Sequence, residues 1–235
     1  MKMTKRIVSI LLVAMMLLTL AACGSKEDLK GEVSDNNISA PSTDVNASVI
    51  TDTTTGETGE TEEFQAGSVT GKTYENKSLG LGINLPGDWT FLSAKELAEQ
   101  NGITYSGSGP VESGNVLYEA MGISGDKTSN IIVNFEDLGA VNGLTMTAES
   151  YIDIVLPQLE KSYTDVGMTL VNSGKIDVTI GGKTFKAIKV ECDYNGVKVY
   201  QNMICVKTGK YMGVIGISGT GANQMDTLLS SFYLV

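Results

Sequence analysis

The sequence predicts an α+β fold, in which a central antiparallel β-sheet is flanked by helices on both faces. Short strand-like segments joined by glycine and asparagine turns recur along the chain, which is typical of antiparallel hairpins. The strands expected at 115–124 and 130–138 carry apolar residues on both faces, so both faces of the sheet should be covered. Helical apolar stripes at 147–163 and 222–232 supply the covering helices.

The first 23 residues are typical of a signal for export and lipid attachment. A basic start is followed at 7–20 by an apolar run of about 14 residues, which is too short for a comfortable membrane span. Residues 20–23, Leu-Ala-Ala-Cys, resemble the lipobox of bacterial lipoproteins. This resemblance implies cleavage before Cys23, lipidation of Cys23, and a lipid-anchored protein on the extracytoplasmic side of the cell membrane.

The segment that follows has the composition of a disordered tether. Serine, threonine and acidic residues dominate it, as in the run TDTTTGETGETEE at 51–63. Its scattered apolar residues cannot bury enough surface to offset the entropy of ordering. We therefore predict a signal peptide at 1–22, the lipidated Cys23 with an acidic tether at 23–72, and a globular domain at 73–235.

The globular domain is expected to begin with two strands and a helix. Residues 79–86 and 89–92 have strand character, with a Gly-Asp turn between them. Ser93 with Glu96 forms a capping box, which predicts a short helix. A glycine- and serine-rich loop follows, and Tyr105 within this loop is our candidate for a surface interaction residue.

The rest of the domain should combine hairpins and helices. A hairpin is expected around Gly125-Asp126, and a helix should begin after Thr147 and be kinked by Pro157. Four strands and a closing helix then complete the chain, with expected ranges of 176–180, 184–194, 198–207, 211–218 and 222–232.

The expected strand register separates the two cysteines of the domain. Asn195-Gly196 predicts a two-residue turn that sets Cys192 opposite Val199. Cys205 then lies roughly 20 Å further along the partner strand, whereas the Cα atoms of a disulfide are at most about 7 Å apart. Cys192 and Cys205 are therefore predicted to be free, buried thiols. A catalytic thiol would need a neighbour that lowers its pKa, and the sequence offers none.

The order of these elements resembles that of the PsbP/Mog-like family. The resemblance rests on Leu-Gly-Leu-Gly-Ile-Asn-Leu-Pro at 79–86 before Trp89, the helix around Tyr151, Ile-Gly-Gly-Lys at 180–183 and the closing segment 228–232. It implies an α/β/α sandwich and a role in binding other proteins. Some members of the family are associated with metal through histidine, which this chain lacks, so that property is not carried over.

Composition excludes several classes of chemistry. The chain has no histidine, and its only arginine, Arg6, belongs to the signal peptide. Ser-His-Asp and Cys-His pairs, imidazole metal ligands and arginine forks are therefore excluded from the mature chain. We predict no cofactor and no metal site. The net charge of -10 argues against a nucleic-acid partner.

The remaining motifs have both a catalytic and a structural interpretation. Residues 124–127, Ser-Gly-Asp-Lys, fit the S-x-x-K pattern of acyl-transfer enzymes, but a hairpin turn explains the same residues. Asp88, Glu136 and Asp137 are carboxylates that would serve acid/base chemistry only if the fold brought them together. Trp89 is expected in the core.

We therefore expect a non-enzymatic protein-binding or adaptor module that Cys23 holds at the membrane, with a protein or cell-wall polymer as its partner. A small-molecule carrier for a transporter is the main alternative, and it predicts an enclosed pocket. A carboxylate-dependent hydrolase is a further alternative, and it predicts two acids in one cleft.

Overall fold

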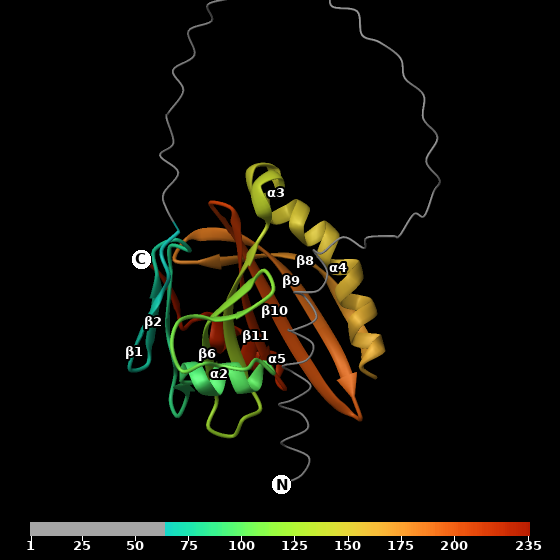
Figure 1. The fold of residues 1–235 in the computed structure, drawn as a ribbon. Coiled ribbons are helices and arrows are strands. Elements are labelled where there is room, and N and C mark those ends of the chain that lie inside the picture. Colours follow the sequence, from blue (N-terminus) through green and yellow to red (C-terminus); the bar gives the residue numbers. More distant parts are fainter. Residues whose placement is uncertain (1–63) are drawn as a thin grey trace, which may run out of the picture. The chain divides into compact units, whose positions relative to one another are not determined.

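The computed structural model describes residues 64–235, which form two antiparallel sheets and several helices (Figure 1). The signal peptide, Cys23 and most of the predicted tether lie outside the described residues. The fold begins before the predicted boundary at residue 73, because Phe64 packs against Phe135 and Tyr211 with ring-centroid distances of 4.8 and 4.6 Å. No helix among residues 64–235 is long and apolar enough to cross a membrane.

The larger sheet has eight strands and is antiparallel throughout. Its order is β4-β6-β7-β11-β10-β9-β8, and β5 pairs with β6 beside this path. The hairpins β6–β7, β8–β9, β9–β10 and β10–β11 join neighbours along the chain, as the turn residues predict. The strands are β4 (Thr90–Phe91), β5 (Val111–Ser113), β6 (Val116–Ile123), β7 (Asn130–Asp137), β8 (Thr169–Ile180), β9 (Lys183–Tyr194), β10 (Val197–Thr208) and β11 (Tyr211–Gly219).

The smaller sheet joins the two ends of the described chain. Its order is β1-β2-β3-β12, so the last strand pairs with a strand near the start of the domain. Phe232 lies opposite Ile83 in this pairing. The strands are β1 (Ser68–Thr70), β2 (Thr73–Asn76), β3 (Leu81–Asn84) and β12 (Phe232–Leu234).

The helices begin where local sequence satisfies their free N–H groups. Ser93 and Thr147 each accept a hydrogen bond from the third helical residue and form complete capping boxes, which confirms the predicted starts of two helices. Pro157 lies inside the longer of these helices, as predicted. The helices are α2 (Ala94–Gln100), α3 (Gly139–Thr145), α4 (Ala148–Asp165) and α5 (Ala222–Leu229).

The two faces of the larger sheet are covered differently. On one face, α4 packs over buried residues of β9 to β11 such as Val190, Met203 and Met212. On the same face, α2 packs over β5 and β6. The opposite face packs against the smaller sheet and α5, whose buried residues include Leu81 and Leu228. Figure 1 shows the smaller sheet and α4 on opposite sides of the long strands.

The predicted α/β/α sandwich is therefore wrong, and the domain is a β-rich fold of two antiparallel sheets. Apolar residues on both faces of a strand indicate that both faces are covered, but they do not distinguish a helix from a second sheet. The segment expected to be a helix at 222–232 is divided, because α5 ends at Leu229 and Phe232 begins β12. The face of the larger sheet opposite α4 is thus covered by one short helix and the four strands of the smaller sheet.

Candidate functional site

A cleft of about 440 Å³ lies between α5 and the face of β8, β9 and β10; we call it the α5 cleft. Its floor includes apolar residues of β8, and α5 forms one wall. The polar side chains that line it come from β9, β10 and α5: Lys189, Tyr200, Asn202, Asn223 and Asp226. Sites of this volume with an apolar floor and a few polar groups are typical of ligand-binding sites.

Strand register brings the polar floor of the cleft together. Asn202 of β10 lies directly opposite Lys189 of β9, and Lys189 lies opposite Gly174 of β8. Residues directly opposite each other in an antiparallel sheet have Cβ atoms about 5 Å apart on one face. A side chain at Gly174 would meet no atom within 4 Å, so the space beside Lys189 is open.

Asn202 is the most unusual residue of this floor. Its exposed fraction is 7%, yet its side chain makes no hydrogen bond to another described residue. The Lys189 ammonium likewise has no ion-pair partner within residues 64–235. The Asn202 amide atoms are not sealed from solvent, so a polar ligand in the cleft can reach and hydrogen-bond them.

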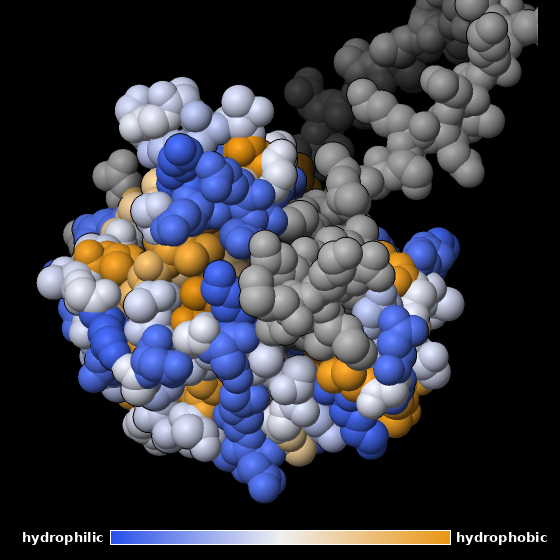
Figure 2. Space-filling view, turned by 90° about the horizontal axis from the view of Figure 1, so that it is seen from below, coloured by the Kyte–Doolittle hydropathy of each residue, from blue (hydrophilic) through white to orange (hydrophobic). Residues whose placement is uncertain are grey.

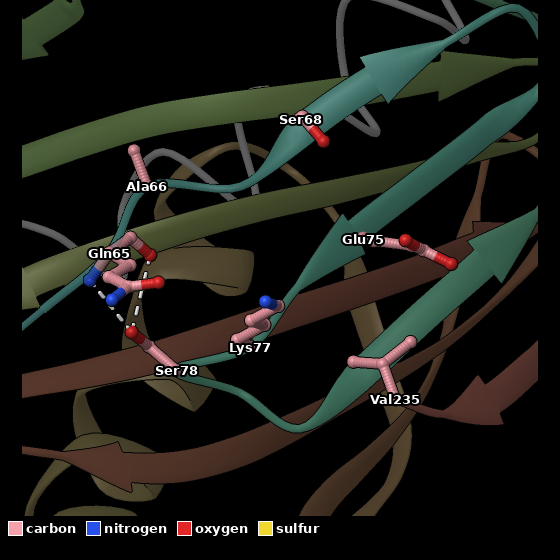
Figure 3. A pocket seen from close by; sticks show the side chains of 7 residues that line it. All are labelled: Gln65, Ala66, Ser68, Glu75, Lys77, Ser78 and Val235. Atoms are coloured by element: carbon pink, nitrogen blue, oxygen red, sulfur yellow. Dashed lines mark hydrogen bonds between the residues drawn. The ribbon is translucent and has the colours of Figure 1, made fainter. Parts of the chain in front are cut away.

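A second pocket, of about 640 Å³, lies at the outer edge of the smaller sheet (Figure 3). Ser78 fixes the segment that enters this sheet, because its hydroxyl accepts from the Gln65 N–H at 2.8 Å and donates to the Gln65 carbonyl at 3.2 Å. Glu75 and Lys77 place opposite charges in the same pocket. Ser78 therefore serves the attachment of Gln65, and Glu75 accepts a hydrogen bond from the Tyr233 hydroxyl of β12 at 2.8 Å.

The face seen in Figure 2 has no single extended apolar surface among the residues drawn in colour. Hydrophobic residues form small patches that hydrophilic side chains interrupt. The large apolar side chains with the greatest exposed fractions are Leu144 and Val141, both on α3. The pocket at the smaller sheet is larger, but lining chemistry favours the α5 cleft as the candidate site.

Tyr105 is half-buried and does not project as a free surface residue. Its ring packs at the margin of the α2 cluster, and its hydroxyl donates to the Gly109 carbonyl at 3.1 Å. Tyr105 thus stabilises its own loop. Trp89 is 5% exposed and lies in the core between the sheets, as predicted.

The three candidate carboxylates do not meet in one place. Asp88 lies against Gly125, and Gly125 belongs to the turn that precedes β7. Glu136 lies at the far end of β7. An eight-residue strand separates these positions by roughly 20 Å. Asp137 follows Glu136 in the strand, so its side chain points to the other face, where it pairs with Lys210 at 2.5 Å.

Glu136 is held by a buried network instead. Its carboxylate accepts hydrogen bonds from the Tyr151 hydroxyl at 2.8 Å and the Asn115 amide at 3.2 Å. Burial raises the pKa of Glu136, and these two hydrogen bonds act in the opposite direction. The network ties β7 to the first turn of α4, which is a structural role.

Cys192 and Cys205 are free and buried, as predicted. The predicted register is also confirmed, with Cys192 opposite Val199 and Cys205 opposite Lys186. Burial raises the pKa of both thiols to about 12, and for Cys192 the neighbouring Glu191 adds to the shift. Neither thiol has the lowered pKa of a nucleophile.

The S-x-x-K segment forms a turn, as predicted. The Ser124 hydroxyl donates to the Asp126 carboxylate at 2.7 Å, and the Lys127 backbone has a φ of 61°. The segment lies between β6 and β7 rather than at the start of a helix, so Lys127 is not aligned with Ser124 for acyl transfer. Within residues 64–235, no three His, Cys, Asp or Glu side chains are placed to hold a metal ion.

The sequence did not single out the residues of the α5 cleft. Asn202 and Lys189 lie in regular strands and belong to no motif. One signal was available: Asn202 lies between Tyr200 and Ile204, two residues of the same strand face that belong to the core.

The chain matches no protein-family model and no curated protein. It is similar to a protein from Bacteroides thetaiotaomicron (12% identity, TM-score 0.37), with 71% of this chain and 49% of that chain covered. It is also similar to LpqN of Mycobacterium tuberculosis, described as involved in cell envelope biogenesis (11% identity, TM-score 0.33; 66% and 83% covered). A third match is protein PA94 of unknown function from Pseudomonas aeruginosa, a putative regulator (14% identity, TM-score 0.28; 42% and 62% covered). This chain thus spans less than two thirds of the Bacteroides and Pseudomonas proteins, and TM-scores of this size assign neither a fold family nor a function.

Proposed function

We propose that this chain is a non-enzymatic binding or adaptor module of the cell envelope, held by a lipid on Cys23 at the outer side of the cytoplasmic membrane. Its binding site in this proposal is the α5 cleft, and its partner is a protein that inserts a polar group between Lys189 and Asn202. The signal-like residues 1–23 support the location.

The observation that carries the proposal is the Asn202 amide, which lines the cleft and has no described hydrogen-bond partner. The Glu136 carboxylate, by contrast, is bonded to two neighbours. The Asn202 amide and the Lys189 ammonium, beside an open space, can both hydrogen-bond a polar group of a ligand.

The arrangement of reactive groups supports a non-enzymatic role. The buried thiols have raised pKa values, and Asp88 and Glu136 lie at opposite ends of a strand. Two acids, Asp177 and Asp226, line the α5 cleft, but the Asp177 carboxylate pairs with Lys186 at 3.0 Å, so the two do not form the pair of free acids that hydrolysis needs. A carboxylate-dependent hydrolase therefore has the least support among the three functions considered.

The anchor is tested by replacing Cys23 with Ser in the full chain. We expect the wild type in the membrane fraction, with a diacylglyceryl-modified amino-terminal peptide in the mass spectrum. The C23S variant should lack that modification and leave the membrane fraction. A wild-type chain with an unmodified Cys23 contradicts the proposal.

The cleft is tested with a photo-cross-linking amino acid at Asn223 of the full chain in intact cells. Asn142, an exposed asparagine of α3, is the matched control position. We expect a defined protein adduct from position 223 that is lost with a second substitution, N202A, and absent from position 142. An adduct that forms equally at both positions contradicts the proposal.

The volume of the cleft also supports the second candidate, a small-molecule carrier. About 440 Å³ is within the range of small-molecule sites. In that case, denaturation of the purified chain should release a stoichiometric small molecule, and N202A should reduce its amount. Release of such a compound, without a protein adduct at Asn223, would favour the carrier.

A further inference from the structure

Strand β8 is the only long free edge among the described strands. Strand β8 has 12 residues, lies at the edge of the eight-stranded sheet and pairs only with β9. The other outermost strands, β1, β4, β5 and β12, have two or three residues each. A long free edge presents a row of backbone N–H and C=O groups to which another strand can bind.

The regular part of this edge has clear limits. A bulge between Leu170 and Asn172 interrupts its beginning. Beyond Ile180 the edge ends, because Leu234 of β12 packs against Gly181. Nine regular residues, 172–180, remain, and the residue at their midpoint is Ile176.

We propose that β8 pairs with β8 of a second copy of this chain, antiparallel about a two-fold axis at Ile176. The two larger sheets then become one continuous sheet. In this register all nine residues of the regular edge are paired, from Asn172 with Ile180 of the second copy to Ile180 with Asn172 of the second copy. Each pair is formed twice, except the central pair of the two Ile176 residues.

Charge complementarity selects this register. With Ile176 at the centre, Lys175 of each copy lies directly opposite Asp177 of the other, which gives two opposite-charge pairs on one face. Moving the axis to a neighbouring residue sets Lys175 against Lys175, or Asp177 against Asp177. An axis two residues away from Ile176 in either direction removes both Lys–Asp pairs.

The charges that face this edge are already balanced within one copy. Lys175 pairs with Asp153 of α4, and Asp177 pairs with Lys186 of β9 at 3.0 Å. Glu149 of α4 lines the same hollow as Lys175 and Asp177. Added pairs across the two-fold axis extend this network without leaving an unpaired charge. A lipid anchor confines the copies to one surface and raises their effective concentration.

The dimer also bears on the α5 cleft. Residues 176–179 of β8 line the side of the cleft away from α5. A second strand paired with β8 would close the side of the cleft that β8 forms. The clefts of the two copies would then lie next to each other across the axis. The dimer does not depend on the binding role of the cleft, so either proposal can fail alone.

Cysteine cross-linking of the full chain in membranes tests the register. The Cα atoms of opposite residues in an antiparallel pair are about 5 Å apart, which suits a disulfide. We expect I176C to form a disulfide-linked dimer under mild oxidation. N172C is the control on the same strand, because the two copies of residue 172 would be roughly 26 Å apart. Cys192 and Cys205 are buried and give no background. A dimer from N172C, or none from I176C, overturns the proposal.

A charge swap tests the pairing itself, with self-association followed in lipid nanodiscs by single-molecule photobleaching or in vesicles by energy transfer. K175E alone and D177K alone each create two like-charge pairs and should weaken dimerisation about tenfold. The double variant K175E/D177K restores opposite charges and should recover most of the affinity. Thermal unfolding of each variant separates loss of fold from loss of pairing. Equal association of all four chains overturns the proposal, as does a double variant that is weaker than either single one.

Discussion

Gln201 and Asn202 are neighbours on β10, but their side chains lie on opposite faces of the larger sheet and have opposite environments. On the α4 face, the Gln201 amide donates to the Ser218 hydroxyl at 2.8 Å and its oxygen accepts from the Tyr163 hydroxyl. On the α5 face, the Asn202 amide has no described partner. Both residues are more than nine-tenths buried.

The difference indicates which polar groups a ligand can reach. On the α4 face, Glu136 and Gln201 belong to networks that fix the long helix to the sheet, and the Asn134 amide oxygen is sealed in without a partner. On the other face, the short helix α5 covers β10 and β11 and leaves the α5 cleft over β8 and β9. Polar residues on this face are available to a ligand.

The largest expected effect comes from removing one buried leucine from each helix. L159A on α4 and L228A on α5 delete side chains that are 2% and 1% exposed. Each should lower the free energy of unfolding by about 2–5 kcal/mol, because each leaves a cavity. Chemical denaturation measures both values. Only L228A should also reduce cross-linking at Asn223, and an equal loss with L159A would remove the distinction between the faces.

A smaller effect is expected from the neighbouring amides themselves. Q201A leaves Tyr163 and Ser218 without their partner and should cost about 1–3 kcal/mol of unfolding free energy. N202A breaks no described hydrogen bond and should change stability by less than about 0.5 kcal/mol. Paired denaturation curves test this contrast. Equal costs would show that Asn202 is structural.

The smallest effect is the pH dependence that Glu136 adds on the α4 face. Burial raises the pKa of Glu136 in the folded state above its unfolded value. Its contribution to stability is therefore fully present below the unfolded pKa and is lost as the pH rises through the folded pKa. Relative to E136Q, the wild type should lose stability over that interval. Unfolding curves for the two chains across acidic pH measure this difference, and parallel curves would contradict the raised pKa.

Local features of the fold could be predicted from the sequence because local chemistry determines them. The capping boxes at Ser93 and Thr147 and the turn at Asn195-Gly196 satisfy their own backbone groups, so they appear as expected. Long-range features could not be predicted in the same way. Strand β12 forms because residues 232–234 pair with β3, which is distant in the sequence. Taken alone, these residues fit a helical apolar stripe equally well.

The candidate site was missed for a related reason. The sequence identified Tyr105 by its flexible-looking loop, whereas its hydroxyl bonds within that loop. Asn202 was overlooked because a polar residue in a strand is usually assigned to the solvent-facing side. Only the pairing of Asn202 with Lys189, and the position of α5, show that this polar pair lines a cleft.

The pairing of β12 with β3 imposes an order on biosynthesis. The smaller sheet joins Leu81 to Leu234, so it cannot close until the segment that contains β12 has been synthesised and is free to pair. Removal of residues 232–235 should therefore leave the smaller sheet unfinished and expose the edge of β3.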